Sequence, residues 1–312
     1  MPRVVFPIVD RFEIFDLAGP LQVLHEANAL GAGYELIFAG LDRSAESQQG
    51  VTVTKLRALP RLGPGDLAMV PGSSVLRERQ SAKNAELAAW LRKAHEAGAA
   101  VASVCVGAFL LGRAGLLDGR ACTTHWKHVG ELARRFPRAR VFDDRLFVFD
   151  DRVLTSAGIA AGVDMTLALI EAQHNAKMAA AIAREMVVHV RRTGTDSQLN
   201  PFLAYRDHLE AGVHAVQDRI IGEPAQRHSL DVLARTAGMS RRHLTRVFLA
   251  ATGISVTEYH NAIRLEHARA LLDNQSLTVD AIAQECGLSD ARHLRRLWKE
   301  AFGTSPRPIP NE

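Results

Sequence analysis

The sequence predicts two domains, an α/β domain built on a parallel sheet and, after it, an all-α domain with two helix-turn-helix motifs. Three observations lead to this class. Short β-branched runs alternate with helical stretches as far as residue 192. An arginine-rich helical segment occurs twice in the last third of the chain. A polar segment, interrupted by Gly and Pro, separates the two regions.

The N-terminal domain, residues 1–192, is predicted from strands and helices that alternate along the chain. Apolar runs with the length of strands occupy 4–9, 35–38, 67–70, 100–104 and 153–155. Helical patterns occupy 16–30, 84–97, 107–111, 162–171 and 177–192. Strands that are separated by helices pair in parallel, so we expect a parallel sheet with helices on both faces.

A linker is predicted over residues 193–205, because this segment opens with the polar sequence TGTDSQLNP. Neither a strand nor a helix fits a run that contains Gly, Asn and Pro at such short intervals. The C-terminal domain then covers residues 206–312.

The C-terminal domain contains one structural unit twice. The sequence RHLTRVF at 242–248 returns as RHLRRLW at 292–298, and each copy follows a turn that contains a glycine, Gly238 or Gly287. Each unit is therefore expected to be a helix, a turn with positive φ at the glycine, and a second helix. The segment 257–272 has the pattern of one continuous helix between the units, and Ser276 is expected to cap the helix that follows.

The second helix of each unit has one apolar and one basic face. In the first copy Leu244, Val247 and Phe248 share a face at helical spacing. The opposite face carries side chains that can contact DNA, namely Arg241, Arg242, Thr245 and Arg246 in the first copy and Arg292, Arg295 and Arg296 in the second. A single helix of this kind is usually a solvated face of a bundle, but the duplication with arginines on matching faces favours DNA binding.

Composition restricts the function less than the repeat does. The chain has 312 residues, a formal charge of +4 and a sequence pI of about 9.2, a balance that suits a DNA-binding protein without requiring one. Its three cysteines and 13 histidines show neither a disulfide framework nor metal-ligand spacing, so we expect no metal and no cofactor. No signal sequence is recognised, and no apolar run approaches the roughly 18 to 20 residues of a membrane span. A cytoplasmic protein is expected.

One residue of the N-terminal domain has a position typical of reactive groups. Cys105 follows the strand pattern directly, and the next residues begin a helix. A cysteine on such a turn lies near a helix N-terminus, where the helix dipole is expected to lower the pKa of the thiol. The alternative, an inert packed cysteine, is equally compatible with this spacing.

From Ala215 to about Pro306 the chain resembles the AraC family of transcription regulators, which carry two helix-turn-helix motifs joined by a long helix. The resemblance implies binding to double-stranded DNA, and a homodimer is expected. At the end the chain departs from the family. Two further prolines, Pro308 and Pro310, follow the Ser-Pro pair, so the last residues are expected to be extended rather than helical.

From about residue 3 to 175 the chain resembles the PfpI-type, glutamine amidotransferase-like superfamily. The segments that carry the resemblance are DLAGP at 16–20, the turn at Cys105, TTHW at 123–126 and TSAG at 155–158. The resemblance implies a flavodoxin-like fold with Asp16 beside the cysteine and His125 able to approach the same pocket. The expected pocket residues are Asp16, Cys105, Val106, His125 and Trp126.

At one position the chain departs from the superfamily's hydrolases, which often have a histidine immediately after the cysteine, where this chain has Val106. That difference removes the usual general base and argues against turnover. The order of the two domains matches the GlxA-like subgroup of AraC regulators. It implies a sensor of a small metabolite, nitrogenous or related to amino acids, rather than an enzyme. Two alternatives stay open, a cysteine-dependent hydrolase or hydratase tethered to a DNA-binding domain, and a redox switch at Cys105.

Overall fold

The computed structural model describes residues 1–78, 81–158, 160–188, 191–194, 196, 198, 201–272, 277–303 and 305–306. The chain divides into two compact units, Met1–Gln198 and Leu199–Glu312. Their boundary falls inside the segment 193–205, where the sequence predicts the linker. In the parts of the chain that the structure describes, no helix combines the length and the apolar character that crossing a membrane requires.

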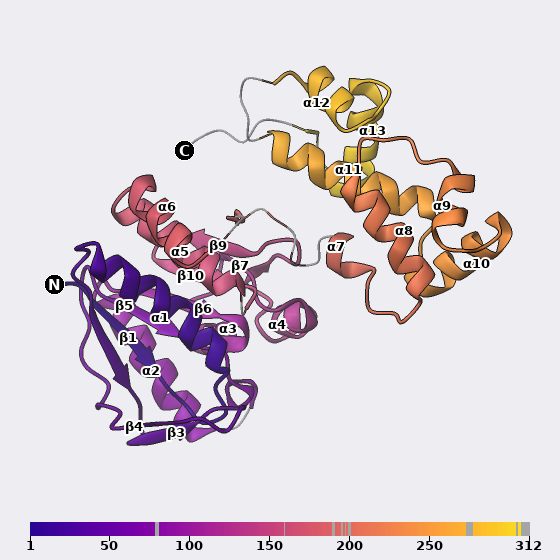
Figure 1. Ribbon diagram of the computed structural model, residues 1–312. Coiled ribbons are helices and arrows are strands. Elements are labelled where there is room, and N and C mark those ends of the chain that lie inside the picture. The colour runs from indigo at the N-terminus through magenta and orange to yellow at the C-terminus, as the bar shows by residue number, and fades with distance from the viewer. Residues whose placement is uncertain are drawn as a thin grey trace. The chain divides into compact units, whose positions relative to one another are not determined.

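The N-terminal unit is built on a six-stranded sheet, with the strand order β2-β1-β5-β6-β10-β9 (Figure 1). Its strands are β1 (Arg3–Pro7), β2 (Glu35–Ala39), β5 (Leu67–Val70), β6 (Ala100–Val104), β9 (Phe147–Asp150) and β10 (Val153–Ser156). The first five in this spatial order pair in parallel, and their order is that of flavodoxin-like sheets. The expected fold class is therefore confirmed.

The sequence did not predict the edge strand β9, which pairs antiparallel with β10. None of its residues is fully buried, so it lacks the continuous apolar run that marks the central strands. Two small ladders were missed for a different reason, since strands of two or three residues are too short for a periodic pattern. They are the antiparallel pair β3 (Ser44–Glu46) and β4 (Thr52–Thr54) and the parallel pair β7 (Ala121–Cys122) and β8 (Arg140–Val141).

Helices cover the sheet in two groups. The helices α1 (Ile14–Ala29), α5 (Ala160–Gln173) and α6 (Ala176–Glu185) pack against one another, and α2 (Ala82–Glu96) packs against α3 (Ala108–Arg113). Right-handed crossovers place the two groups on opposite faces. The remaining helical segments are α4 (Val129–Arg135) and the 3₁₀ turns η1 (Ser74–Arg77), η2 (Cys105–Gly107) and η3 (Trp126–His128).

The prediction that a helix extends over 177–192 is wrong at its C-terminal end, because α6 ends at Glu185. Val187 has a φ of 55°, which the α-helix does not allow. Beyond it, Arg192 donates through its backbone N–H and its guanidinium to the buried carboxylate of Asp164. This ion pair holds the end of the N-terminal unit against α5.

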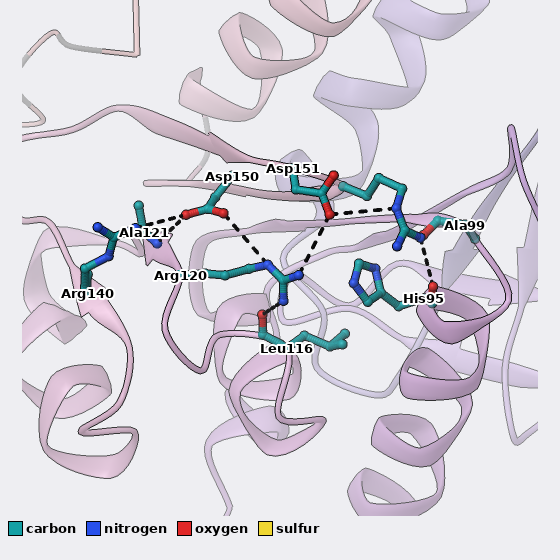
Figure 2. A network of polar contacts seen from close by, with 9 residues as sticks. His95, Ala99, Leu116, Arg120, Ala121, Arg140, Asp150 and Asp151 are labelled. Atoms are coloured by element: carbon teal, nitrogen blue, oxygen red, sulfur yellow. Dashed lines mark hydrogen bonds and ion pairs between the residues drawn. The ribbon is translucent and has the colours of Figure 1, made fainter.

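A polar network closes the end of the sheet at which β10 begins (Figure 2). Arg120 lies between the carboxylates of Asp150 and Asp151, and Asp150 also accepts the backbone N–H of Ala121 at 2.7 Å. Arg152 lies 3.8 Å from Asp151 and donates to the carbonyl oxygen of His95. The network ties the β9–β10 turn to the start of β7 and the end of α2. Cys105 follows the opposite, carboxyl end of β6, because β6 and β10 are parallel.

The C-terminal unit consists of seven described helices around two cores. They are α7 (Pro201–Ala204), α8 (Ala211–Gly222), α9 (Leu230–Thr236), α10 (Arg241–Thr252), α11 (Val256–Leu272), α12 (Val279–Glu285) and α13 (Ala291–Phe302). The first core contains Leu233, Leu244 and Phe248, and the second contains Ile282 and Trp298. The long helix α11 contributes to both cores, which confirms the two predicted helix-turn-helix units and the helix between them.

The glycines of both turns have positive φ as expected, 65° at Gly238 and 68° at Gly287. The helix after the spacer begins later than predicted, since the side chain of Thr278 caps α12. Ser276, the predicted cap, and the C-terminal residues predicted to be extended, 307–312, lie outside the described residues.

Candidate nucleic-acid interface and ligand site

The two second helices, α10 and α13, present basic side chains to solvent and bury their apolar faces. On α10, Leu244 and Phe248 are fully buried, and on α13 Leu294 is fully buried and Trp298 is 8% exposed. The predicted DNA-contacting residues all have exposed side chains on these helices, namely Arg241, Arg242, Thr245, Arg246, Arg292, Arg295 and Arg296. The structure thus places four of them on α10 and three on α13.

These side chains differ in what they already contact. Arg241 forms an ion pair with Asp231, and Arg296 pairs with Glu300 at 2.9 Å. Arg246 lies 3.2 Å from the ring of His243. The guanidinium groups of the other three arginines have no hydrogen-bond or ion-pair partner among the residues that the structure describes; they are Arg242, Arg292 and Arg295. These three are therefore the most readily available to phosphate or base edges.

A pair of aspartates positions the second helices, and sequence reasoning missed both. Asp231, at the start of α9, forms an ion pair with the guanidinium of Arg241. Asp280, at the start of α12, accepts the backbone N–H of Ala291 at 3.2 Å. Each aspartate thus connects the first helix of its motif to the N-terminus of the second. Their recurrence in equivalent places, in LDVL and VDAI, is the signal that could have identified them.

The loop between α8 and α9 connects the two helix-turn-helix units. Arg264, on α11, donates to the carbonyl oxygens of Pro224 at 2.9 Å and Gln226 at 3.1 Å. The ring of His260 hydrogen-bonds to the same Pro224 oxygen at 2.9 Å, and burial lowers the pKa of His260 to about 4. At Gly287 a Cβ atom would lie 1.9 Å from the backbone oxygen of Ala225, so only glycine fits there. The loop therefore contributes to the spacing of α10 and α13.

In the N-terminal unit, Cys105 lies on the turn between β6 and α3, as predicted. Its φ of 56° is unusual for a residue with a side chain and is the geometry of a strained elbow. The hydroxyl of Thr124 donates to the Cys105 carbonyl oxygen at 2.7 Å. Two glycines let the backbone come close, since a Cβ at Gly158 would lie 3.0 Å from the sulfur and one at Gly72 would lie 3.1 Å from the Cys105 Cβ.

Asp16 lies directly beside the thiol. It is fully buried on α1, accepts the backbone N–H of Gly72 at 3.2 Å and accepts a hydrogen bond from Cys105. Burial, and then the negative charge of Asp16, raise the pKa of the Cys105 thiol well above its usual range. The expectation of a lowered thiol pKa is thus wrong, because desolvation and a neighbouring carboxylate outweigh the helix N-terminus.

His125 and Trp126 form a separate aromatic pair in this unit. Their rings stack with centroids 5.6 Å apart, and the His125 Nδ1 accepts the backbone N–H of Lys127. Trp126 is 44% exposed, so its ring faces solvent. Among the described residues no hydrogen bond joins the His125 ring to Cys105. The structure therefore brings together Asp16, Cys105 and Val106, whose side chain is 5% exposed, while the connection to His125 runs through the backbone of Thr124.

The last residues of the N-terminal unit contact the segment that holds Cys105. Gln198 donates to the hydroxyl of Thr123 at 3.0 Å and to the carbonyl oxygen of Thr124 at 2.9 Å. Because Thr124 in turn holds Cys105, the segment that leads into the C-terminal unit lies two hydrogen bonds from the cysteine. No sequence motif marks Gln198, because its contacts with Thr123 and Thr124 arise only when the chain folds back onto that segment.

The other two cysteines, Cys122 and Cys286, are free and buried, and burial raises the pKa of both thiols. Within the described ranges, no group of three or more His, Cys, Asp or Glu side chains has the geometry to hold a metal ion.

Comparisons with known proteins match both halves of the chain. Residues 2–172 match the DJ-1/PfpI family, and residues 233–309 match a helix-turn-helix domain family. The HTH-type transcriptional regulator GbdR of Pseudomonas aeruginosa is 30% identical over 97% of this chain and 82% of its own length. The HTH-type transcriptional regulator GlxA of Rhizobium meliloti is 31% identical over 69% of this chain and 66% of its own.

Solved structures share the fold of the N-terminal unit. An AraC family transcriptional regulator from Pseudomonas putida superposes with a TM-score of 0.52 and 23% identity, covering 60% of this chain and all of its own. A ThiJ/PfpI family protein from Pseudomonas syringae gives the same TM-score at 19% identity and covers 76% of this chain and 91% of its own.

Proposed function

The chain belongs to the DJ-1/PfpI family and to the AraC-type regulators that join such a domain to a helix-turn-helix domain, and from this membership we propose that a small molecule bound by its N-terminal domain controls DNA binding by its C-terminal domain. The observation that most directly supports DNA binding is the pair of helices, α10 and α13, that expose arginines on corresponding faces. The protein is a DNA-binding transcription regulator, as its relatives are.

The helices that contact the bases are α10 and α13. Arg242, Thr245 and Arg246 contact one segment of the major groove, and the arginines of α13 contact a second segment about one helical turn away. An arginine fork binds the O6 and N7 atoms of guanine, so these side chains distinguish base sequences. A homodimer brings a second pair of these helices to the DNA and therefore binds a longer operator.

The ligand site is centred on Asp16 and Cys105, with Val106, His125 and Trp126 around it. The buried carboxylate of Asp16 favours a ligand with a positively charged or hydrogen-donating nitrogen, in keeping with a nitrogenous or amino-acid-related effector. A ligand that displaces the Asp16–Cys105 hydrogen bond also disturbs the turn that Thr124 holds. Through Thr124 and Gln198 that change reaches the segment leading to the DNA-binding unit.

Catalysis is the second candidate function, because Asp16 hydrogen-bonds to the thiol and is placed to act as its base. Three observations favour the sensor instead. The raised pKa of Cys105 keeps the thiol neutral, and a neutral thiol is a poor nucleophile. Val106 occupies the position where the superfamily's hydrolases often have a histidine. The relatives that match the chain along most of its length are named as transcriptional regulators.

A metabolite screen on the full chain tests the proposal. Amines, amino acids and amides are added singly. The melting temperature is measured, together with the affinity for a selected duplex, meaning one that the full chain has selected from random sequences. We expect at least one compound to raise the melting temperature and also to change the DNA affinity, with both effects reduced by Asp16→Asn. A compound that is consumed during incubation, at a rate dependent on Cys105, would instead identify an enzyme.

A further inference from the structure

A hollow in the surface of the N-terminal unit gathers four arginines from three elements. We call it the arginine hollow; it is lined by Arg77 from η1, Arg113 from α3, Glu131, Arg134 and Arg135 from α4, and Phe136. Its volume of about 730 Å³ lies within the usual range for small-molecule sites. Neither the ligand site at Cys105 nor the helices that bind DNA use these side chains.

The single carboxylate in the hollow is shared between two of the arginines. One oxygen of Glu131 accepts from the Nε of Arg77 at 3.1 Å and from its Nη2 at 2.5 Å. The other oxygen accepts from Arg135 at 3.2 Å. Glu131 therefore neutralises one positive charge and orients two guanidinium groups, while Arg135 also lies over the ring of Phe109 at 5.2 Å.

The other two arginines add positive charge that Glu131 does not balance. Arg113 donates to the backbone oxygen of Glu78. The exposed guanidinium of Arg134 has no hydrogen-bond or ion-pair partner anywhere in the described part of the chain. With four arginines and one glutamate, the lining of the hollow has a formal excess of three positive charges.

An excess of guanidinium groups in a concave site is suited to an anion with several oxygens. Guanidinium forks match phosphate oxygens geometrically, and the paired arginines here are already oriented by Glu131. The ring of Phe136 offers an apolar surface for the remainder of the ligand. We propose that the arginine hollow binds the phosphate group of a small phosphorylated molecule. A concave site of this volume suits a compact ligand better than the convex backbone of a duplex.

Calorimetry with the full chain in 150 mM chloride tests the proposal, using inorganic phosphate, pyrophosphate and AMP as probes. We expect binding of at least one probe, and a loss of affinity of roughly tenfold or more in Arg134→Ala. Inorganic phosphate alone would indicate the free ion as the ligand, whereas preference for AMP would indicate a phosphorylated metabolite. The second result supports the proposal, and the first contradicts it, because the ligand would then be the free ion.

Two variants separate binding from structure. Glu131→Gln removes a negative charge and keeps an oxygen that accepts from Arg77, so the affinity for the probe should rise, which a merely structural role would not produce. Arg138→Ala removes an arginine that pairs with Asp118 outside the hollow, and it should bind as the wild type does. The proposal is wrong if no probe binds at millimolar concentration, if Arg134→Ala and Arg138→Ala weaken binding equally, or if duplex DNA alone competes for the hollow.

Discussion

At the scale of single residues, the arginines of α10 and α13 differ in the contacts that each would lose on binding DNA. Arg242 and Arg292 have no ion pair to break among the described residues, whereas Arg241 pairs with Asp231. Arg242→Ala or Arg292→Ala should therefore weaken binding to the selected duplex by roughly 1 to 3 kcal/mol and relax the preference at one base position. Fluorescence anisotropy with selected and random duplexes at one salt concentration measures both effects.

The control for this prediction is Arg219→Ala, which removes a cation from α8 and should leave the sequence preference unchanged. We expect Arg241 to contact phosphate rather than a base. Arg241→Ala should therefore weaken binding to all duplexes alike and make the salt dependence shallower. A melting temperature that falls without any change in salt dependence would assign Arg241 to the α9–α10 contact alone. Equal affinity of the wild type for random and selected duplexes would contradict the proposed reading of bases.

Cys105 separates the sensor from the enzyme. Cys105→Ser retains the size of the side chain but removes the thiol, so the fold and the basal DNA affinity should be unchanged while the response to effector changes. Asp16→Asn should act similarly, because an amide alters both the charge and the direction of the hydrogen bond. The readout is the effector concentration at half-maximal change in DNA affinity. Turnover of a small substrate that Cys105→Ser abolishes would show that Asp16 or His125 serves as a base.

At the scale of elements, the loop between α8 and α9 makes the C-terminal unit sensitive to acid. Burial lowers the pKa of His260 to about 4, against an ordinary value of 6.5. Above pH 6.5 the ring is neutral in the folded and unfolded chain, so its contribution to stability is complete. As the pH falls from 6.5 to 4 only the unfolded chain gains the proton, and the folded state loses about 2 kcal/mol by pH 5.

Urea unfolding of the wild type and His260→Gln at pH 7.5 and pH 5 isolates this effect. The glutamine can still donate to the Pro224 oxygen but does not titrate, so its loss of stability on acidification should be smaller by that amount. Identical losses in the two proteins would mean that His260 is protonated in the folded state near its ordinary pKa. In that case burial would not be the dominant influence on the ring.

Most elements follow from local pattern, and those that do not depend on contacts remote in sequence. The repeat placed α10, α11 and α13 correctly, since apolar spacing and the turn glycines are local signals. The end of α6 was not predicted. The helix ends at Glu185, Val187 has a φ of 55°, and Arg192 pairs with Asp164, a contact remote in sequence. Likewise, the position of Cys105 was predictable, but the direction of its pKa shift depends on how completely the fold buries it beside Asp16.

At the scale of the whole molecule, the segment before the second unit is tied to the proposed ligand site through Gln198, while Arg192 holds it against α5 through Asp164. Gln198→Ala removes the hydrogen bonds to Thr123 and Thr124 without touching Asp16 or Cys105. We expect this variant to bind effector and DNA with normal affinity but to show a reduced effect of one on the other. Glu171→Gln, which breaks the neighbouring exposed pair with Arg191, is the matched control. Unaltered coupling in Gln198→Ala would exclude this route.

The sequence and the structure differ on where an independent DNA-binding fragment should begin. The sequence places the start of the DNA-binding domain at 206, whereas the second unit starts at Leu199 and packs Phe202 and Tyr205 against its first core. The backbone oxygen of Tyr205 accepts from the buried amide of Gln217 at 2.6 Å, and its ring lies 5.9 Å from that of Tyr259. Because a fragment 199–312 retains both cores, it should fold and bind DNA. It should not respond to effector, since it lacks the proposed ligand site.

The fragment 206–312 should be less stable, since it lacks these aromatic contacts and leaves the Gln217 amide without its acceptor, a change worth roughly 1 to 3 kcal/mol. Thermal unfolding followed by circular dichroism, together with anisotropy on the selected duplex, compares the two fragments. If both are equally stable, α7 contributes nothing to the first core. If 199–312 is helical and stable but binds no duplex that the full chain binds, the N-terminal unit itself is needed for binding, most simply by bringing two copies of the chain together on one operator.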